Sequence, residues 1–258
     1  MINLGPSGLG PVKEAIANLE EFSRLGITAC EIAFTYGAYI KEEKDAVLIG
    51  KKAKELGIKL SIHGPYWINL NSLEKSKIEM SKKRLLECLK VGTWLGVEKV
   101  VFHAGFYGKD DKEKTYQTIK ESLTEVIKEA KKNKFTPELA PETMGKINVF
   151  GSVEEISRLV KDTGCSFCID FAHILARYKD YKFEEVKELF KEKDWHIHFS
   201  GIEYTDKGER RHLRVEKSDW KTLFENLPKG KNLNIICESP EPVKDSIEGI
   251  VIKKKILG

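Results

Sequence analysis

Histidine, aspartate and glutamate side chains recur where predicted β-strands end in this 258-residue chain. The segment CSFCID, residues 165–170, reads as a short buried strand that ends at Asp170, with His173 close behind it. Other predicted strands end in the same way, at His63, His103, Glu142, His198 and Glu238. Imidazole nitrogens and carboxylate oxygens are ligands of Zn²⁺, Mn²⁺ and Fe²⁺. The recurrence therefore indicates metal chemistry at a place where strand ends meet.

A single polar residue at the end of a strand is more often a helix cap, a turn former or a satisfied polar group. The whole set is harder to explain in that way, because few Lys or Arg residues stand at the same positions to balance its charge. The set also contains more potential ligands than one tetrahedral ion can bind. We infer at least two divalent metals, with a carboxylate that bridges them.

The elements that must position these groups alternate between strand and helix patterns along the whole chain. Predicted strands cover residues 2–5, 27–34, 58–63, 97–103, 134–142, 165–170, 195–200 and 233–238. Helical patterns cover residues 11–26, 44–57, 72–96, 111–133, 152–164, 183–193, 218–227 and 245–257. A loop is expected after Asp170, and another around His212 in the basic segment GERRHL.

Strict alternation of strands and helices predicts an α/β fold with a parallel sheet and right-handed crossovers. Eight such units in about 250 residues favour closure into a (β/α)₈ TIM barrel, here a single domain over residues 1–258, whose C-terminal strand ends meet at one mouth. A Rossmann fold is disfavoured, because the GPSGLG that follows the first strand lacks the G-x-G-x-x-G spacing.

Composition sets broad limits on location and partners. Hydrophobic residues make up 41% of the chain, enough for a full core, and the net charge of +4 permits a polyanionic partner without requiring one. The N-terminus lacks a signal-peptide pattern, and no apolar run is long enough for a membrane span. We expect a soluble cytoplasmic monomer with no membrane association. The five cysteines are scattered in apolar runs and are expected to be reduced core residues.

Six segments carry a resemblance to a known family. In chain order, HGPYWINL, FHAG, APETMGK, CIDFAH, HIHFSG and ESP resemble the endonuclease IV family of apurinic/apyrimidinic endonucleases, within the xylose isomerase-like barrels. The resemblance runs over nearly the whole chain, and HGPYWINL is its most specific segment. It implies an endonuclease of DNA base-excision repair that hydrolyses the phosphodiester 5′ to an abasic site in double-stranded DNA.

The resemblance also implies a zinc site of two or three ions, with Mn²⁺ as the alternative. His63 and His103 would bind one ion, and Glu142, the central catalytic carboxylate, would bridge it to a second. The second ion would be completed by Asp170, His198 and Glu238. His196 alternates with His198 on one strand face and is expected to be a supporting core group.

A third ion would be bound by His173 and His212, but here the sequence departs from the family. The family places an aspartate two residues before the histidine that matches His212, whereas Arg210 stands there and the nearest carboxylate is Glu209. Either Glu209 replaces the missing ligand, or the Arg210 guanidinium holds the phosphate in place of an ion.

Aromatic and basic residues in the loops after the strands suit a nucleic acid, because aromatic rings stack on bases and cations hold phosphates. Tyr66 matches the family residue that contacts DNA where the base is missing. Trp67, Tyr39 and Arg210 are further DNA-binding candidates. Additional loop residues of the same kinds are Tyr36, Phe106, Tyr107, Lys109, Arg177, Tyr178, Lys179, Tyr181, Arg211 and Arg214.

Two other functions compete with the nuclease. Sugar isomerases and epimerases of the same barrel type are similar in using one Mn²⁺-like ion held by a Glu, Asp, His, Glu set, which this chain has as Glu142, Asp170, His198 and Glu238. They do not require a histidine pair like His63 and His103. A DNA-binding module with a structural metal is the third candidate, although structural metal sites are normally closed.

Overall fold

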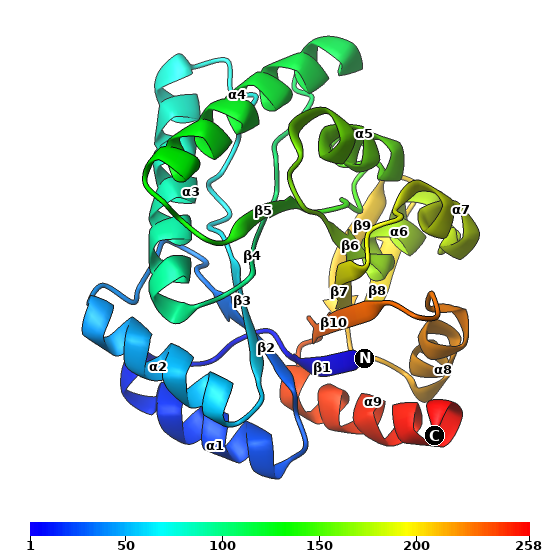
Figure 1. Ribbon diagram of the computed structural model, residues 1–258. Coiled ribbons are helices and arrows are strands. Elements are labelled where there is room, and N and C mark those ends of the chain that lie inside the picture. Colours follow the sequence, from blue (N-terminus) through cyan, green and yellow to red (C-terminus); the bar gives the residue numbers. More distant parts are fainter.

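Two four-stranded parallel sheets form the centre of the protein, which a computed structural model describes for residues 1–258 (Figure 1). One sheet has the order β1 (Ile2–Pro6), β10 (Asn232–Cys237), β7 (Asp194–Phe199) and β6 (Cys168–Asp170). The other has the order β2 (Ala29–Ala33), β3 (Lys59–His63), β4 (Lys99–Phe102) and β5 (Glu138–Pro141).

Isolated parallel bridges join the two sheets into a closed ring. Ser7 pairs with Glu31 between β1 and β2, and Glu142 pairs with Cys168 between β5 and β6. Gly5 permits the first of these junctions, because a Cβ atom there would lie 1.6 Å from the carbonyl oxygen of Ala29. The predicted (β/α)₈ TIM barrel is therefore confirmed.

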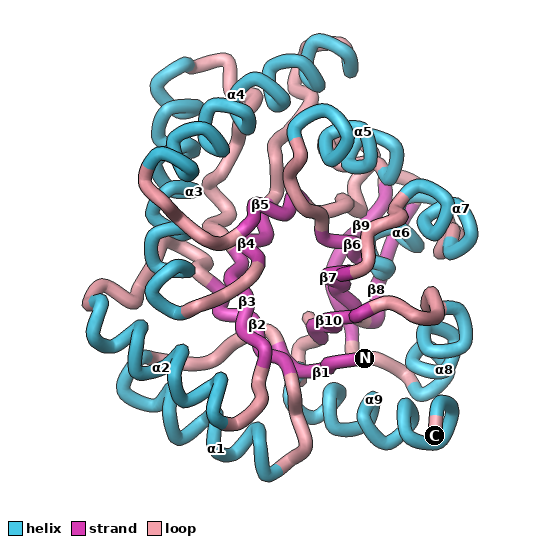
Figure 2. Tube along the Cα trace, in the orientation of Figure 1, coloured by secondary structure: helices cyan, strands magenta, loops and turns pink.

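Helices surround the strands on all sides of the barrel (Figure 2). They are the 3₁₀ helix η1 (Val12–Glu14) and the α-helices α1 (Ala15–Arg24), α2 (Glu43–Glu55), α3 (Lys75–Leu95), α4 (Lys112–Lys132), α5 (Val153–Thr163), α6 (Phe171–Tyr178), α7 (Phe183–Leu189), α8 (Lys217–Asn226) and α9 (Pro242–Leu257). A capping box of Ser152 and Glu155 begins α5. None of the helices has the length and apolar character needed to cross a membrane.

The predicted loop after Asp170 is wrong, because α6 begins directly at the end of β6. The Asp170 carboxylate accepts a hydrogen bond of 2.7 Å from the backbone N–H of His173, which makes Asp170 the N-cap of this helix. The helix predicted over residues 183–193 ends earlier, at Leu189. The first difference affects the site, since the helical turn fixes His173 beside Asp170.

The basic segment around His212 was expected to be a loop, and that prediction is also wrong. It forms an antiparallel hairpin of β8 (Gly201–Thr205) and β9 (Gly208–Leu213), which follows β7 outside the barrel ring. The pairing shifts register between Glu203 and Tyr204: Glu203 faces Arg211, whereas Tyr204 faces Glu209. Arg210 is therefore an extra residue without a partner, a β-bulge.

The core lies between the barrel and its helices, and its largest fully buried side chains include Trp195, Trp220 and Phe199. All five cysteines are buried and unpaired, as the sequence predicted. Polar side chains are also fully buried inside the ring, among them Glu31, Glu142 and Asp170. Such groups are costly inside a core unless they are paired or bind a metal.

Candidate metal centre

The carboxylate of Glu142 lies at the centre of the polar cluster and is fully buried. Its Oε2 atom is 3.2 Å from Nε2 of His63 and 3.1 Å from Nε2 of His103. Its Oε1 atom faces the other way and is 3.3 Å from Nδ1 of His198. The two oxygens of one carboxylate thus serve two separate groups of potential ligands.

The tautomer of His63 follows from its second hydrogen bond. Nδ1 lies 2.8 Å from the carbonyl oxygen of Gly64, which only accepts, so Nδ1 carries the proton. The Nε2 lone pair then points at an anionic oxygen of Glu142, and a proton or a cation must lie between them. Burial alone would lower the pKa of His63, but the nearby carboxylates, Glu142 first and then Glu31 and Glu238, outweigh it and raise the pKa to about 9.

On the Oε1 side, the ligand atoms of Glu142, Asp170, His198 and Glu238 all lie within 4.8 Å of one another. Burial raises the pKa of Asp170, and its Oδ2 atom has no hydrogen-bond partner. Burial also opposes ionisation of Glu142, but the surrounding imidazoles, His198 first, hold its pKa well below the ordinary value. No Lys or Arg side chain forms an ion pair with these carboxylates.

This donor set fits divalent cations. It combines neutral imidazoles with buried carboxylates, its negative charge is not balanced by Lys or Arg, and one carboxylate oxygen is unpartnered. A closed group of side chains of this kind is stabilised when a cation occupies it, and mixed nitrogen and oxygen ligation suits Zn²⁺ or Mn²⁺. The residues therefore fit the metal that the motifs imply.

A third group, His173 and His212, lies beside the second. Nδ1 of His173 is 3.0 Å from the carbonyl oxygen of Thr143, and Nδ1 of His212 is 3.0 Å from that of Glu238. Both Nδ1 atoms must therefore carry the proton, and the two Nε2 lone pairs face each other at 3.2 Å. Two lone pairs so close repel unless a proton or a cation lies between them.

Two carboxylates lie beside this histidine pair: the ligand atoms of Asp170, His173 and His212 lie within 4.8 Å of one another, and Glu209 approaches from β9. Its Oε2 atom is 3.4 Å from Nε2 of His173, and it lines the same cavity as His212. Gly145 leaves the space that it occupies, since a Cβ atom there would lie 2.7 Å from Cβ of Glu209. Arg210 instead forms an ion pair of 2.6 Å with Glu203 and is exposed. Of the two alternatives that the sequence left open, the geometry favours Glu209 as the ligand.

One buried carboxylate in the barrel was not identified from the sequence. Glu31 on β2 lies 3.0 Å from Nε2 of His196 and 2.9 Å from Nε2 of His198. Burial would raise its pKa, but these imidazoles, His198 first, hold it well below the ordinary value. The available signal was an acidic residue in the otherwise apolar run ITACEIAF.

Above the ligands lies a cavity of about 600 Å³, whose lining includes His63, His103, Glu209 and the aromatic residues Tyr66 and Phe106. Tyr66 is 60% exposed, and its ring centroid is 5.8 Å from that of His103. Trp67 is equally exposed and lies 6.5 Å from Tyr36 between ring centroids. The exposed ring of Tyr66 thus lies at the cavity, directly beside His63 and His103.

The other DNA-binding candidates are placed differently. The Tyr39 hydroxyl donates to the carbonyl oxygen of Gly10, and the ring packs on Phe34. Arg210 and Arg211 both pair with Glu203. Several more are held by other parts of the protein: Arg214 by Asp245, Tyr107 by Glu155, Tyr178 by Glu154, and Arg177 and Lys179 by backbone carbonyls. None of these groups lines the cavity, and each has a partner elsewhere in the protein.

Comparison with known proteins identifies the family of the chain. Residues 19–255 match the family described as xylose isomerase-like TIM barrel. An uncharacterised protein of Methanocaldococcus jannaschii is 36% identical over 96% of this chain and 95% of its own length. An apurinic-apyrimidinic endonuclease of Caenorhabditis elegans is 30% identical, over 69% of this chain but only 50% of the relative. A probable endonuclease 4 of Aquifex aeolicus is 30% identical, over 58% of this chain and 54% of the relative.

Solved structures share the fold. Endonuclease IV from Thermus thermophilus superposes with a TM-score of 0.72 at 20% identity, covering 99% of this chain and 98% of that one. A D-tagatose 3-epimerase-like protein gives 0.73 at 18% identity, covering 99% and 97%. At these identities the structures show the fold alone, whereas the sequence relatives confirm the resemblance to endonuclease IV. The chain belongs to the family of xylose isomerase-like TIM barrels.

Proposed function

We propose that this protein is a divalent-metal-dependent DNA endonuclease that hydrolyses the phosphodiester 5′ to an abasic site. The observation that carries the proposal is the two-sided environment of Glu142. One oxygen faces His63 and His103, and the other faces the group that contains His198. A carboxylate in this arrangement suits the bridge between two metal ions, which is a common device for phosphodiester hydrolysis.

The residues that would hold the metals fall into three sets. His63, His103 and Glu142 form the first, and Glu142, Asp170, His198 and Glu238 form the second. His173 and His212 form the third with Glu209 and with Asp170, which it shares with the second set. Zinc bound there would supply a hydroxide nucleophile at neutral pH and stabilise the charge that develops on the phosphate.

The chain itself contributes position and substrate recognition. Backbone carbonyls orient His63, His173 and His212, so that each presents Nε2 to the cavity. Tyr66 and Trp67 offer exposed rings for stacking at the point where a base is absent. Moving an abasic nucleotide into the cavity costs little, because no base has to be unpaired, and this favours damaged over intact DNA.

The isomerase or epimerase alternative has support from one feature. Glu142, Asp170, His198 and Glu238 form a complete single-ion set, and the cavity has a volume typical of small-molecule sites. However, this set leaves the His63 and His103 pair without a role. The relatives of known name at about 30% identity are named endonucleases, which also favours the nuclease.

A duplex with one abasic site, incubated with the purified protein, tests the proposal. Cleavage on the 5′ side, lost with a chelator and restored by Zn²⁺ or Mn²⁺, is the expected result, and the same duplex without the lesion is the matched control. If the protein leaves the abasic duplex intact but interconverts ketoses in the presence of Mn²⁺, the epimerase function replaces the nuclease. Binding without turnover of either substrate would indicate a DNA-binding module.

A further inference from the structure

Glu31 lies in the middle of β2, inside the barrel and beneath the metal ligands, and it is fully buried. It does not line the cavity and belongs to none of the segments that carry the family resemblance. A buried carboxylate without a cationic partner is costly, so its surroundings must compensate for its charge. The question is which groups do so.

Three polar side chains surround the Glu31 carboxylate. Its Oε2 atom accepts hydrogen bonds from Oγ of Ser61 at 2.8 Å and from Nε2 of His196 at 3.0 Å. Its Oε1 atom is 2.9 Å from Nε2 of His198, but the two atoms are not aligned as a hydrogen bond, and both are buried without any hydrogen-bond partner. An ionised carboxylate only accepts, so Nε2 of His196 carries a proton toward Oε2, and a proton on Nε2 of His198 is the one that would satisfy the unpartnered Oε1.

A proton on Nε2 of His198 leaves the lone pair on Nδ1. That atom faces the metal centre, at 3.3 Å from Oε1 of Glu142 and 3.4 Å from Oε2 of Glu238. We propose that Glu31 is a positioning residue, whose carboxylate fixes the tautomer and the orientation of His198 so that Nδ1 is available to the metal. The inference rests on the proposed metal centre, and it adds a carboxylate–histidine–metal connection from a strand that supplies no ligand.

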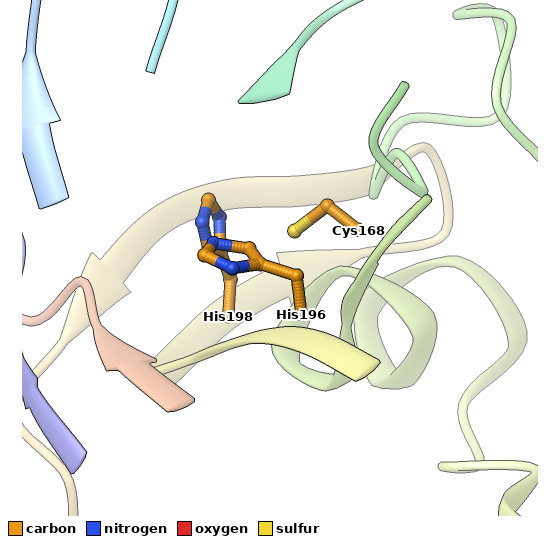
Figure 3. A group of neighbouring side chains, drawn as sticks. All are labelled: Cys168, His196 and His198. Atoms are coloured by element: carbon orange, nitrogen blue, oxygen red, sulfur yellow. The ribbon is translucent and has the colours of Figure 1, made fainter. Parts of the chain in front are cut away.

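The nearby cluster of Cys168, His196 and His198 could be mistaken for a metal site of its own. Figure 3 shows the sulfur of Cys168 pointing toward the two imidazole rings, and the ligand atoms of the three lie within 4.8 Å of one another. However, both ring nitrogens of His196 are engaged, Nε2 with Glu31 and Nδ1 with the amide of Asn234 at 3.3 Å. His196 therefore has no free lone pair, and it supports Glu31 instead.

The decisive variant is Glu31→Gln, which keeps the size of the side chain but removes its charge and one acceptor. We expect zinc affinity, measured by competition with a chelator, to fall by about 10- to 100-fold, the usual effect of losing such a supporting partner. In ¹⁵N spectra of the zinc-loaded protein, the Nε2–H signal of His198 should be present in wild type and lost or shifted in the variant. Asp245→Asn is the matched control, because Asp245 is a buried carboxylate that pairs with Arg214 away from the metals.

Unchanged zinc affinity and an unchanged His198 signal in Glu31→Gln would overturn the inference, and so would a wild type that binds no divalent metal. If Glu31→Gln does not fold, Glu31→Asp replaces it as the test. This variant keeps the charge but moves the carboxylate away from His198, and its zinc affinity should fall by less than is expected for Glu31→Gln. A Cys168→Ser variant that loses one bound metal would show instead that the buried cluster is itself a site. Zinc binding is measured without DNA, so it tests the role of Glu31 separately from the nuclease. If Glu31→Gln binds zinc more weakly but the wild type does not cleave DNA, only the proposed nuclease function is refuted.

Discussion

Oε2 of Glu209 lies 3.4 Å from Nε2 of His173, although Glu209 is three residues before His212 on β9 and both line the same cavity. In a regular strand, residues three apart point to opposite faces. The bulge at Arg210 adds one residue to this strand and restores the common direction. The bulge thus lets two side chains three residues apart in sequence line the same cavity.

The first prediction concerns the third metal. Glu209→Gln should lower the metal content of the purified protein by one ion, because the two imidazoles would be left with only Asp170, a carboxylate that the second group also uses. Arg210→Ala is the matched control, and it should leave the metal content unchanged, since Arg210 pairs with Glu203. Metal analysis of the two variants provides the comparison. A drop in Arg210→Ala with none in Glu209→Gln would contradict the assignment.

Gly145 offers a separate test of the same arrangement. In Gly145→Ala, the new methyl group would lie 2.7 Å from Cβ of Glu209 and 3.1 Å from Cδ2 of His173. The methyl group would displace Glu209 or His173 from the third group. We therefore expect the third ion to bind at least about tenfold more weakly than in wild type. Titration with zinc in a calorimeter measures this directly. Gly26→Ala serves as a control for glycine replacement, as no atom lies near its Cβ position, although its positive φ of 77° costs some stability.

The second residue to test is Glu142. Glu142→Gln should abolish cleavage of an abasic duplex, because a neutral amide cannot balance two ions, while the core below remains intact. The zinc-free protein should still fold, but its melting temperature near neutral pH should fall, because protonated His63 loses its anionic partner. Rates of strand cleavage and thermal melting are the two measurements. Turnover close to that of wild type would reject the bridging role.

The sequence predicted the fold and most of the polar cluster for a physical reason. In a closed parallel barrel, all C-terminal strand ends lie at one mouth, so strand prediction alone brings His63, Glu142 and His198 together. Glu31 could not be found in that way. It lies mid-strand, and its partner His196 is 165 residues away, so only the three-dimensional arrangement shows that it faces inward.

Glu209 and the basic loop residues show a second limit of sequence patterns. Strand periodicity predicts that the side chains of Glu209 and His212 point to opposite faces of the strand. Only the bulge turns them to the same face. Arg214 and Arg177 appeared to be cations available for phosphate, but Asp245 binds the first and backbone carbonyls bind the second. A sequence shows which charged residues a loop contains. Whether such a residue can bind a ligand depends on the ion pairs and hydrogen bonds that it forms within the protein.

Tyr66 provides a test of DNA recognition that leaves the metals alone. Tyr66→Ala should weaken binding to an abasic duplex by about 1–3 kcal/mol, the range for one stacking contact, and should leave the metal content unchanged. Tyr39→Phe is a control, because the Tyr39 hydroxyl donates to Gly10 and the ring packs on Phe34. Fluorescence anisotropy with abasic and intact duplexes measures both variants. Equal affinity of Tyr66→Ala and wild type for the abasic duplex would exclude a stacking role.

The last prediction concerns pH and metal together. In the metal-free protein, burial opposes protonation of His63, but the nearby carboxylates, Glu142 first, raise its pKa from 6.5 to about 9. A group whose pKa is higher in the folded state stabilises the fold fully below its unfolded pKa, and this stability is lost as pH rises through the folded value. The metal-free protein should therefore become less stable between pH 6.5 and 9, by up to about 3 kcal/mol from this group.

Zinc should reverse that trend, because it binds unprotonated imidazole and replaces the proton between His63 and Glu142. The stabilisation by zinc should thus increase across the same pH window, and the slope should be smaller in His63→Gln. Thermal melting with and without chelator, from pH 6 to 9.5, separates the two forms. A metal-free protein whose melting temperature is constant over this range would show that no proton is held between His63 and Glu142, and the argument for a cation at that position would fail with it.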